Sequence, residues 1–199
     1  ETDKPALVLK TSSAAFSVKE RENMRKKILE VVSSIENPPP IYLLFGELTD
    51  SEMNDLYNHP KIKAMVSITK GEGFGRPLLE FTMTGKPVLA SNWSGHKDFL
   101  TMDNSILIGG NLTEVDESTI DNFIIKGAKW FTANYNEASG AMRLLIDNYD
   151  TFLEKAERLR INNEYNFSLE RMKDVFKRIL DPQIDIPKPP SKYTNLVLP

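Results

Sequence analysis

A glycine-rich turn carries the residue types best suited to hold a charged ligand. Residues 71–76 read Gly-Glu-Gly-Phe-Gly-Arg, directly after the apolar run Ala64–Ile68, and Pro77 suits the first turn of a helix. Ligands of open α/β sheets bind where the carboxyl end of a strand meets the amino end of a helix. Glycines let the backbone approach a ligand, and the free amides of residues 74–76 would point at an anion that the helix dipole favours. The turn is therefore a predicted phosphate site.

Two glutamates bracket this turn. Glu72 lies within it, and Glu80 follows eight residues later, one turn inside the predicted helix. A carboxylate there suits a pair of sugar hydroxyls, because it accepts two hydrogen bonds at once. Taken singly, Glu72 could be a solvated turn residue, and Glu80 an exposed carboxylate paired with Lys86 or Arg76. Together with Gly-Phe-Gly between them, the two glutamates are a far more specific pattern than either alone.

The elements that must position these residues alternate between strands and helices. Capping boxes mark helices that begin at Ser17 (with Glu20) and at Thr49 (with Glu52), and Gly85 can end the helix after Pro77. Five apolar runs, continuous as in strands covered on both faces, are predicted strands: 6–9, 41–45, 64–68, 87–90 and 106–108. This order predicts βαβ units, and hence an α/β fold with a mainly parallel sheet flanked by helices.

After Gly110 the regular alternation of predicted strands and helices ends. Residues 123–131 fit either extended structure or a covered loop, helices are predicted from about Ser139, and a last helix is predicted near 168–180. Trp130 and Tyr135 are expected in the core. Residues 182–199 hold five prolines and predict an extended tail.

Composition excludes several classes of protein. The chain has 199 residues, of which 40% are hydrophobic and 27% charged, as in a globular domain. Its net charge of −3 disfavours sequence-independent binding of nucleic acid, and it has no cysteine for a disulfide, a thiolate nucleophile or a zinc–thiolate site. No apolar run could span a bilayer and no signal peptide is present, so we expect a cytoplasmic protein. The first residue is Glu1, and we expect the chain to be a piece of a longer one.

Residues 67–91 resemble the donor-site signature of retaining GT-B glycosyltransferases of family 4. The family pattern is a strand, then Glu-Gly-Phe-Gly, a second Glu after seven residues, Gly-x-Pro-Val, and a strand that ends in small residues; here these are Glu72–Gly75, Glu80, Gly85–Val88 and Ala90–Ser91. Upstream, residues 48–57 resemble the family's short helix beside the nucleotide. The resemblance is good over residues 40–110 and weak elsewhere. It implies a Rossmann-like donor-binding domain, the C-terminal half of a GT-B enzyme.

The resemblance also implies roles for individual residues. Glu72 would be the catalytic residue, close to the donor sugar and bonded to its hydroxyls, and Glu80 would hold the ribose of a UDP- or GDP-sugar. The turn would bind the sugar and diphosphate, chiefly through backbone amides; its implied binding residues are Gly73, Phe74, Gly75 and Arg76, with Leu48 upstream. Transfer in this family retains the anomeric configuration and needs neither a cofactor nor a metal, and this sequence lacks an Asp-x-Asp motif of the metal-dependent kind.

The sequence departs from the family pattern in two places. An Arg and a Lys that usually grip the diphosphate after the first strand are missing, which leaves Lys10, or in second place Lys19, as the substitute; a solvated loop charge is the alternative for Lys10. After the fourth strand, Gly-Gly-x-x-Glu is replaced by Ser94–Asp98, so Asp98 would substitute for the acid. His96 in this segment is expected at the surface rather than as a catalytic base.

The predicted organisation is a single nucleotide-sugar-binding domain over residues 1–181, followed by the tail. The N-terminal GT-B lobe, which binds the acceptor glycan, lipid or protein, would be absent, and the fragment would transfer little sugar alone because two lobes must close to exclude water. Two other functions stay open: a non-catalytic GT-B-like interaction or scaffold module, and another GT-B enzyme such as a sugar-nucleotide epimerase. A phosphorylase would need a pyridoxal lysine site, which the sequence does not indicate.

Overall fold

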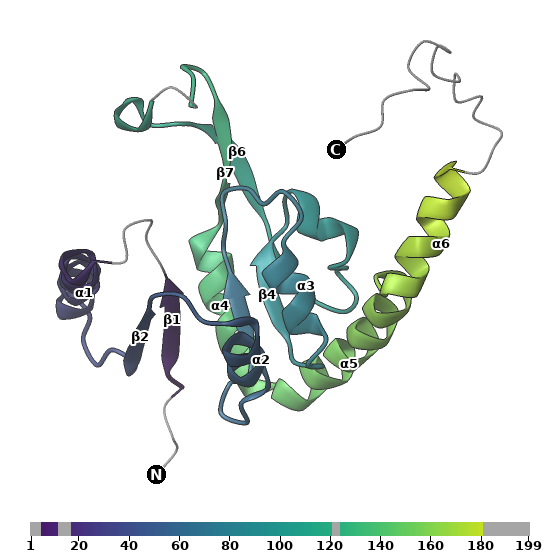
Figure 1. Cartoon of the computed structure of the whole chain (residues 1–199). Helices are drawn as coiled ribbons and strands as arrows, with labels where there is room; N and C mark the ends of the chain where they lie inside the picture. The colour runs from purple at the N-terminus through teal and green to yellow at the C-terminus, as the bar shows by residue number, and fades with distance from the viewer. Residues whose placement is uncertain (1–4, 12–16, 121–123, 181–199) are drawn as a thin grey trace, which may run out of the picture. The chain divides into compact units, whose positions relative to one another are not determined.

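The computed structural model describes residues 5–11, 17–120 and 124–180 (Figure 1). The chain divides into two compact units, Glu1–Leu56 and Tyr57–Pro199, which we call unit 1 and unit 2. The tail predicted over residues 182–199 lies outside the described residues.

Unit 1 is built on a pair of parallel strands. Strands β1 (Leu7–Thr11) and β2 (Ile41–Phe45) pair with Leu7 opposite Ile41, and helix α1 (Val18–Ser33) lies between them in the sequence. The predicted capping box begins α1: the Ser17 hydroxyl accepts a hydrogen bond from the Glu20 amide, and the Glu20 carboxylate accepts one from the Ser17 amide, both at 3.2 Å.

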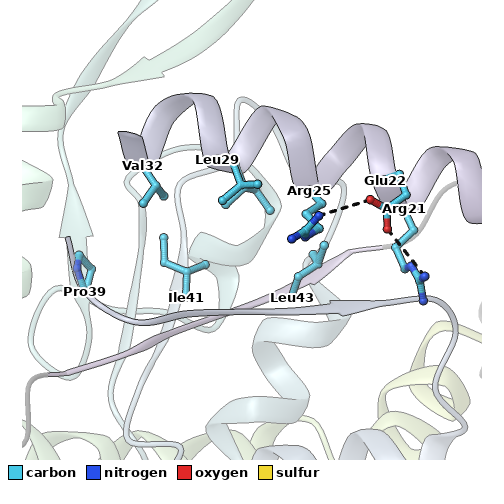
Figure 2. A pocket seen from close by; sticks show the side chains of 9 residues that line it. Arg21, Glu22, Arg25, Leu29, Val32, Pro39, Ile41 and Leu43 are labelled. Carbon is cyan, nitrogen blue, oxygen red and sulfur yellow. Dashed lines mark ion pairs between the residues drawn. The ribbon is translucent and has the colours of Figure 1, made fainter. Parts of the chain in front are cut away.

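The strands of unit 1 are less covered than predicted. Helix α1 faces β2 across a cavity of about 540 Å³, and the side chains that line it are mostly apolar (Figure 2). Leu7 and Val8 on β1 are 41% and 37% exposed, and no described residue of unit 1 is buried. Taken by itself, unit 1 therefore does not cover both faces of these strands, and the cavity keeps the apolar side chains of α1 and β2 from close packing.

Unit 2 holds the core. Strands β3 (Met65–Ser67), β4 (Val88–Ser91) and β5 (Ile106–Ile108) form a parallel sheet with β4 in the centre. Side chains of β4 alternate between two buried clusters, Val88 and Ala90 in one and Leu89 in the other, so this strand is covered on both faces, as its continuous apolar run predicted. Helix α2 (Asp50–Asn58) crosses the boundary of the units, and its predicted Thr49–Glu52 capping box is confirmed.

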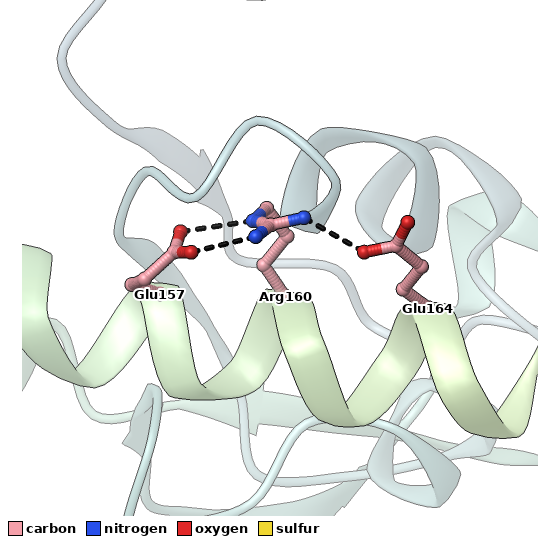
Figure 3. A network of polar contacts seen from close by, with 3 residues as sticks. All are labelled: Glu157, Arg160 and Glu164. Carbon is pink, nitrogen blue, oxygen red and sulfur yellow. Dashed lines mark hydrogen bonds and ion pairs between the residues drawn. The ribbon is translucent and has the colours of Figure 1, made fainter.

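Helices cover this sheet. Helix α3 (Arg76–Thr82) buries Leu78 and Phe81. Helix α5 (Tyr149–Asn166) packs against α3, and the side-chain amide of Asn163 donates a buried hydrogen bond of 3.1 Å to the Thr82 hydroxyl. Along α5, Arg160 pairs with Glu157 and Glu164, each at 2.7 Å (Figure 3). Helices α4 (Tyr135–Asp147) and α6 (Leu169–Leu180) complete the helical part.

Beyond Gly110, the structure settles one open alternative and differs from two expectations. Strands β6 (Gly110–Glu114) and β7 (Lys129–Ala133) pair as an antiparallel ribbon, so the ambiguous segment is extended at its end. Helix α4 begins four residues earlier than predicted, because the Asn134 side chain accepts hydrogen bonds from the amides of residues 136 and 137. Tyr135, expected in the core, is 66% exposed.

Candidate functional site

The glycine-rich turn leaves β3 and enters α3, as predicted. Gly75 has the left-handed conformation (φ +90°) that allows the chain to turn into the helix, and Pro77 lies in the first turn of α3. The backbone N–H groups of residues 74–76 donate to no acceptor among the described residues. Gly71 and Gly73 border open space: a methyl group added at either would meet no atom within 4 Å. The turn thus has backbone donors without a described partner, and it borders open space at Gly71 and Gly73.

Backbone carbonyls before and within the turn are held by three other segments. The Ser91 hydroxyl at the end of β4 donates to the Thr69 carbonyl at 2.7 Å, and the Phe131 amide of β7 donates to the Lys70 carbonyl at 3.0 Å. The Gly95 amide donates to the Glu72 carbonyl at 3.0 Å. The start of the turn is therefore fixed to the unit 2 core and not free to collapse.

Segment 94–98, after β4, lies directly against the turn. A methyl group at Gly95 would come within 1.9 Å of the Gly73 carbonyl oxygen, so only glycine fits there without moving the backbone. A methyl group at Gly75 would lie 3.0 Å from Cβ of His96. Two glycines thus allow the segments to touch.

His96 is fully buried, which corrects the expectation that it lies at the surface. The short helix η1 (Gly95–Asp98) turns His96 inward while Lys97 and Asp98 stay exposed. Its Nε2 lies 2.6 Å from the Ser91 carbonyl, and its Nδ1 has no partner in the described part of the chain. The helical spacing of His96 with the buried Phe99 and Leu100 is the sequence signal that indicates this burial.

The two glutamates flank the turn in different environments. Glu72 is half-buried, with its Cγ 3.2 Å from the position that a Gly75 side chain would occupy. Glu80 is exposed and forms an ion pair with Arg76 at 3.1 Å. Arg76 is one of the two partners expected from the sequence for an exposed Glu80. Because exposed pairs of this kind contribute at most about 1 kcal/mol, the Glu80 carboxylate stays available to another donor.

The other candidate partner of Glu80 is engaged elsewhere. The Lys86 ammonium donates to the Tyr57 and His59 carbonyls at 2.6 and 2.9 Å. Partial burial lowers the Lys86 pKa, and repulsion from the charge of Lys63 lowers it further. Burial raises the pKa of the Tyr57 phenol, and the charge of the Glu80 carboxylate raises it further.

Phe74 and three residues of unit 1 complete the set of predicted ligand-binding residues. The Phe74 ring packs on Phe99 and Phe167, with centroids 5.3 and 6.0 Å apart. Unit 1 holds Lys10, whose ammonium donates to the Gly46 carbonyl at 2.8 Å, Lys19 in the exposed first turn of α1, and the half-buried Leu48. Unit 2 therefore gathers Glu72, Glu80 and residues 73–76, and the other three candidates belong to unit 1.

Sequence reasoning missed Ser94. Its φ of +82° and ψ of −165° belong to a region that only glycine adopts readily, at a cost of about 1–3 kcal/mol for other residues. The signal was present: the family pattern has glycine at this position.

The part of the chain that the structure describes offers neither a metal site nor a membrane-spanning helix. No group of three or more His, Asp or Glu side chains there could hold a metal ion. No helix of the described part is long and apolar enough to cross a membrane.

Solved structures resemble this chain in fold. HepE from Anabaena, crystallised with UDP-glucose, aligns with a TM-score of 0.59 at 15% identity over 88% of this chain and 40% of its own. A glycosyltransferase from Rickettsia africae gives 0.59 at 15% identity over 92% and 49%. The chain thus spans less than half of each structure. The likeness shows a GT-B Rossmann-like fold, with parallel sheets flanked by helices.

Sequence comparison points the same way. No curated protein matches the sequence. The family model described as "Glycosyl transferases group 1", however, matches residues 22–164, which include the turn, Glu72 and Glu80. Since the match covers well over half of the sequence, the chain belongs to the group 1 glycosyltransferase family.

Proposed function

We propose that this chain is the donor-binding half of a retaining glycosyltransferase, which moves a hexosyl group from a UDP- or GDP-sugar to an acceptor. The observation that carries the proposal is the turn at residues 71–76: the amides of residues 74–76 donate to no described acceptor, Gly71 and Gly73 border open space, and the turn contains Glu72 and precedes Glu80. The family match and the UDP-glucose bound to the similarly folded HepE support it.

In the proposed reaction, the bond between the anomeric carbon and the diphosphate oxygen breaks, and the diphosphate leaves with the electron pair. An acceptor hydroxyl oxygen bonds to the anomeric carbon on the same face of the sugar, and its proton passes to the leaving diphosphate oxygen. The amides of residues 74–76 and the Arg76 guanidinium stabilise the charge on the leaving diphosphate without a metal. Glu72 bonds the sugar hydroxyls and Glu80 the ribose hydroxyls. Lys10 and Lys19 are the proposed further cations.

A second lobe is part of the proposal. We propose one donor domain over residues 1–181, which needs an N-terminal lobe that binds the acceptor glycan, lipid or protein. The chain spans 40–49% of the structures it resembles, which leaves room for such a lobe. Helix α6 supports it with exposed apolar side chains, including Leu169 at 65%, Phe176 at 61% and Ile179 at 58%.

Titration of the chain with UDP and with UDP-glucose, followed by thermal stabilisation and calorimetry, tests the proposal. Glu80→Ala is expected to weaken both ligands about 10-fold or more, because the ribose is common to them. Glu72→Ala is expected to weaken UDP-glucose but not UDP, because only the donor carries the sugar. In the full-length protein, Glu72→Ala should also reduce transfer. GDP and GDP-glucose serve as the parallel pair for a guanine donor.

Glu154→Ala is the matched control, since Glu154 is an exposed helical glutamate on α5. Both affinities should be unchanged in this variant. A chain that binds none of the four ligands would favour the scaffold module instead. Normal affinities in both Glu72→Ala and Glu80→Ala would refute the assigned roles.

A further inference from the structure

Ser94 adopts a backbone conformation that its side chain makes unfavourable. Its φ of +82° lies in the left-handed half of φ space, and its ψ of −165° excludes the common left-handed well. Asn37 also has positive φ, at 55°, but asparagine tolerates that region far better than serine does. Glycine would be the unstrained choice at position 94, so the presence of serine calls for a reason.

The reason lies in what the hydroxyl contacts. Oγ of Ser94 accepts a hydrogen bond of 3.1 Å from the Glu72 amide and donates one to the Glu72 carbonyl. The Gly95 amide donates to the same carbonyl at 3.0 Å. Both polar backbone groups of Glu72 are therefore held by residues 94 and 95, the first of which is twenty-two positions away in the sequence.

Glycine at position 94 would remove the strain and also remove both hydroxyl bonds. Glycine at position 95 is needed separately, because any side chain there would strike the Gly73 carbonyl. The two residues thus act differently: Gly95 allows the segments to touch, and Ser94 bonds the Glu72 backbone once they do.

We infer that Ser94 is a positioning residue, which fixes the Glu72 backbone so that its carboxylate meets the donor sugar. The inference deepens the proposed function and rests on it. Interactions with a substrate depend steeply on placement, and an error of about 1 Å can cost a factor of about 100 in rate. Without the Ser94 hydroxyl, the Glu72 amide would lose its acceptor, and of these bonds only the one from the Gly95 amide to the Glu72 carbonyl would remain.

Ser94→Gly and Ser94→Ala separate positioning from folding. Ser94→Gly is expected to leave thermal stability unchanged or raise it, because it removes the strain. UDP affinity should stay within about 2-fold of the parent, and UDP-glucose affinity should fall about 5- to 10-fold, a weaker form of the Glu72→Ala pattern. Ser94→Ala should show the same ligand pattern with lower stability, because it keeps the strain and loses the bonds. Asn37→Gly, which removes positive-φ strain far along the sequence, should change neither affinity.

Amide hydrogen exchange of Glu72, followed by NMR without ligand, is the second measurement. Exchange should be faster in Ser94→Gly and unchanged in Asn37→Gly, because only the former frees the Glu72 amide. Unchanged exchange, or equal weakening of UDP and UDP-glucose together with lost stability, would overturn the inference. If Glu72→Ala itself spares UDP-glucose affinity while exchange responds as expected, the proposed role of Glu72 fails and the backbone bond to Ser94 stands.

Discussion

Unit 1 and unit 2 contain similar apolar runs but bury them to very different degrees. Leu29 on α1 is 49% exposed, whereas Leu89 on β4 is fully buried in one of the two core clusters of unit 2. Helix α1 faces β2 across a cavity, whereas helix α3 packs directly on the sheet of unit 2. The glycine-rich turn is attached to the well-packed unit. A turn that must hold hydrogen-bond donors in place for a ligand needs such rigid support, and unit 2 supplies it.

The largest expected difference between the units comes from the same truncation made in each. Leu89→Ala should destabilise unit 2 by about 2–5 kcal/mol, because it leaves a cavity in a closed core. Leu29→Ala should cost less than about 1 kcal/mol, because the side chain is already half in water. Chemical denaturation of both variants measures this. Equal losses would show that unit 1 is packed as tightly as unit 2.

The next largest expected difference in stability is between alanine substitutions at Gly95 and at Gly73, both in unit 2. Gly95→Ala must displace the Gly73 carbonyl and is expected to cost about 1–3 kcal/mol. Gly73→Ala meets no atom within 4 Å, so its stability should be equal to that of the parent or up to about 1 kcal/mol higher. Thermal unfolding separates the two. Similar melting temperatures would mean that the turn moves freely and is not supported by segment 94–98.

Filling the cavity of unit 1 should narrow the difference between the units. Val32 lines the cavity, so Val32→Leu is expected to stabilise the protein by about 0.5–2 kcal/mol. Val31→Leu, on the same helix but 63% exposed, is the matched control and should stay within about 0.5 kcal/mol. No gain from Val32→Leu over Val31→Leu in denaturation would mean that the cavity is already closed in solution.

The smallest expected effect concerns the capping box that begins α2. Hydrogen bonds from the Thr49 amide and hydroxyl lower the pKa of the Glu52 carboxyl below its ordinary value of 4.5. A lowered folded-state pKa contributes stability above the unfolded pKa, and this is lost as pH falls through the folded value. An NMR titration should therefore find the Glu52 midpoint below 4.5, and Thr49→Ala should return it towards 4.5. An unshifted midpoint in the parent would mean that this helix start frays in solution.

Local signals predicted most elements because their causes lie within a few residues. A capping box needs only positions three apart, as at Ser17 and Glu20, and a proline in the first helical turn acts through its own ring. The Asn134 cap was missed because Asn is also an ordinary loop residue. The β6–β7 ribbon was missed because its pairing joins Gly110 to Ala133, and distant pairing leaves no local pattern.

The candidate site divides in the same way. Gly75 at the helix start, the two glutamates and the family pattern could be read from adjacent residues, since spacing along one turn and one helix places them. The bonds of Ser94 to Glu72 could not, because they join two segments that meet across the sheet edge. The burial of His96 had a local signal, its helical spacing with Phe99 and Leu100, which the expectation of a surface position did not use.

What the sequence by itself determined is therefore the type and order of the elements and the residues at the turn, because hydrogen bonding and backbone preference act locally. Only the tertiary structure decided which strands are covered on both faces and what holds Glu72. Those outcomes depend on how tightly segments far apart in the sequence pack against one another. The similar apolar runs of β2 and β4 therefore end in different environments, with β2 partly exposed and β4 fully buried.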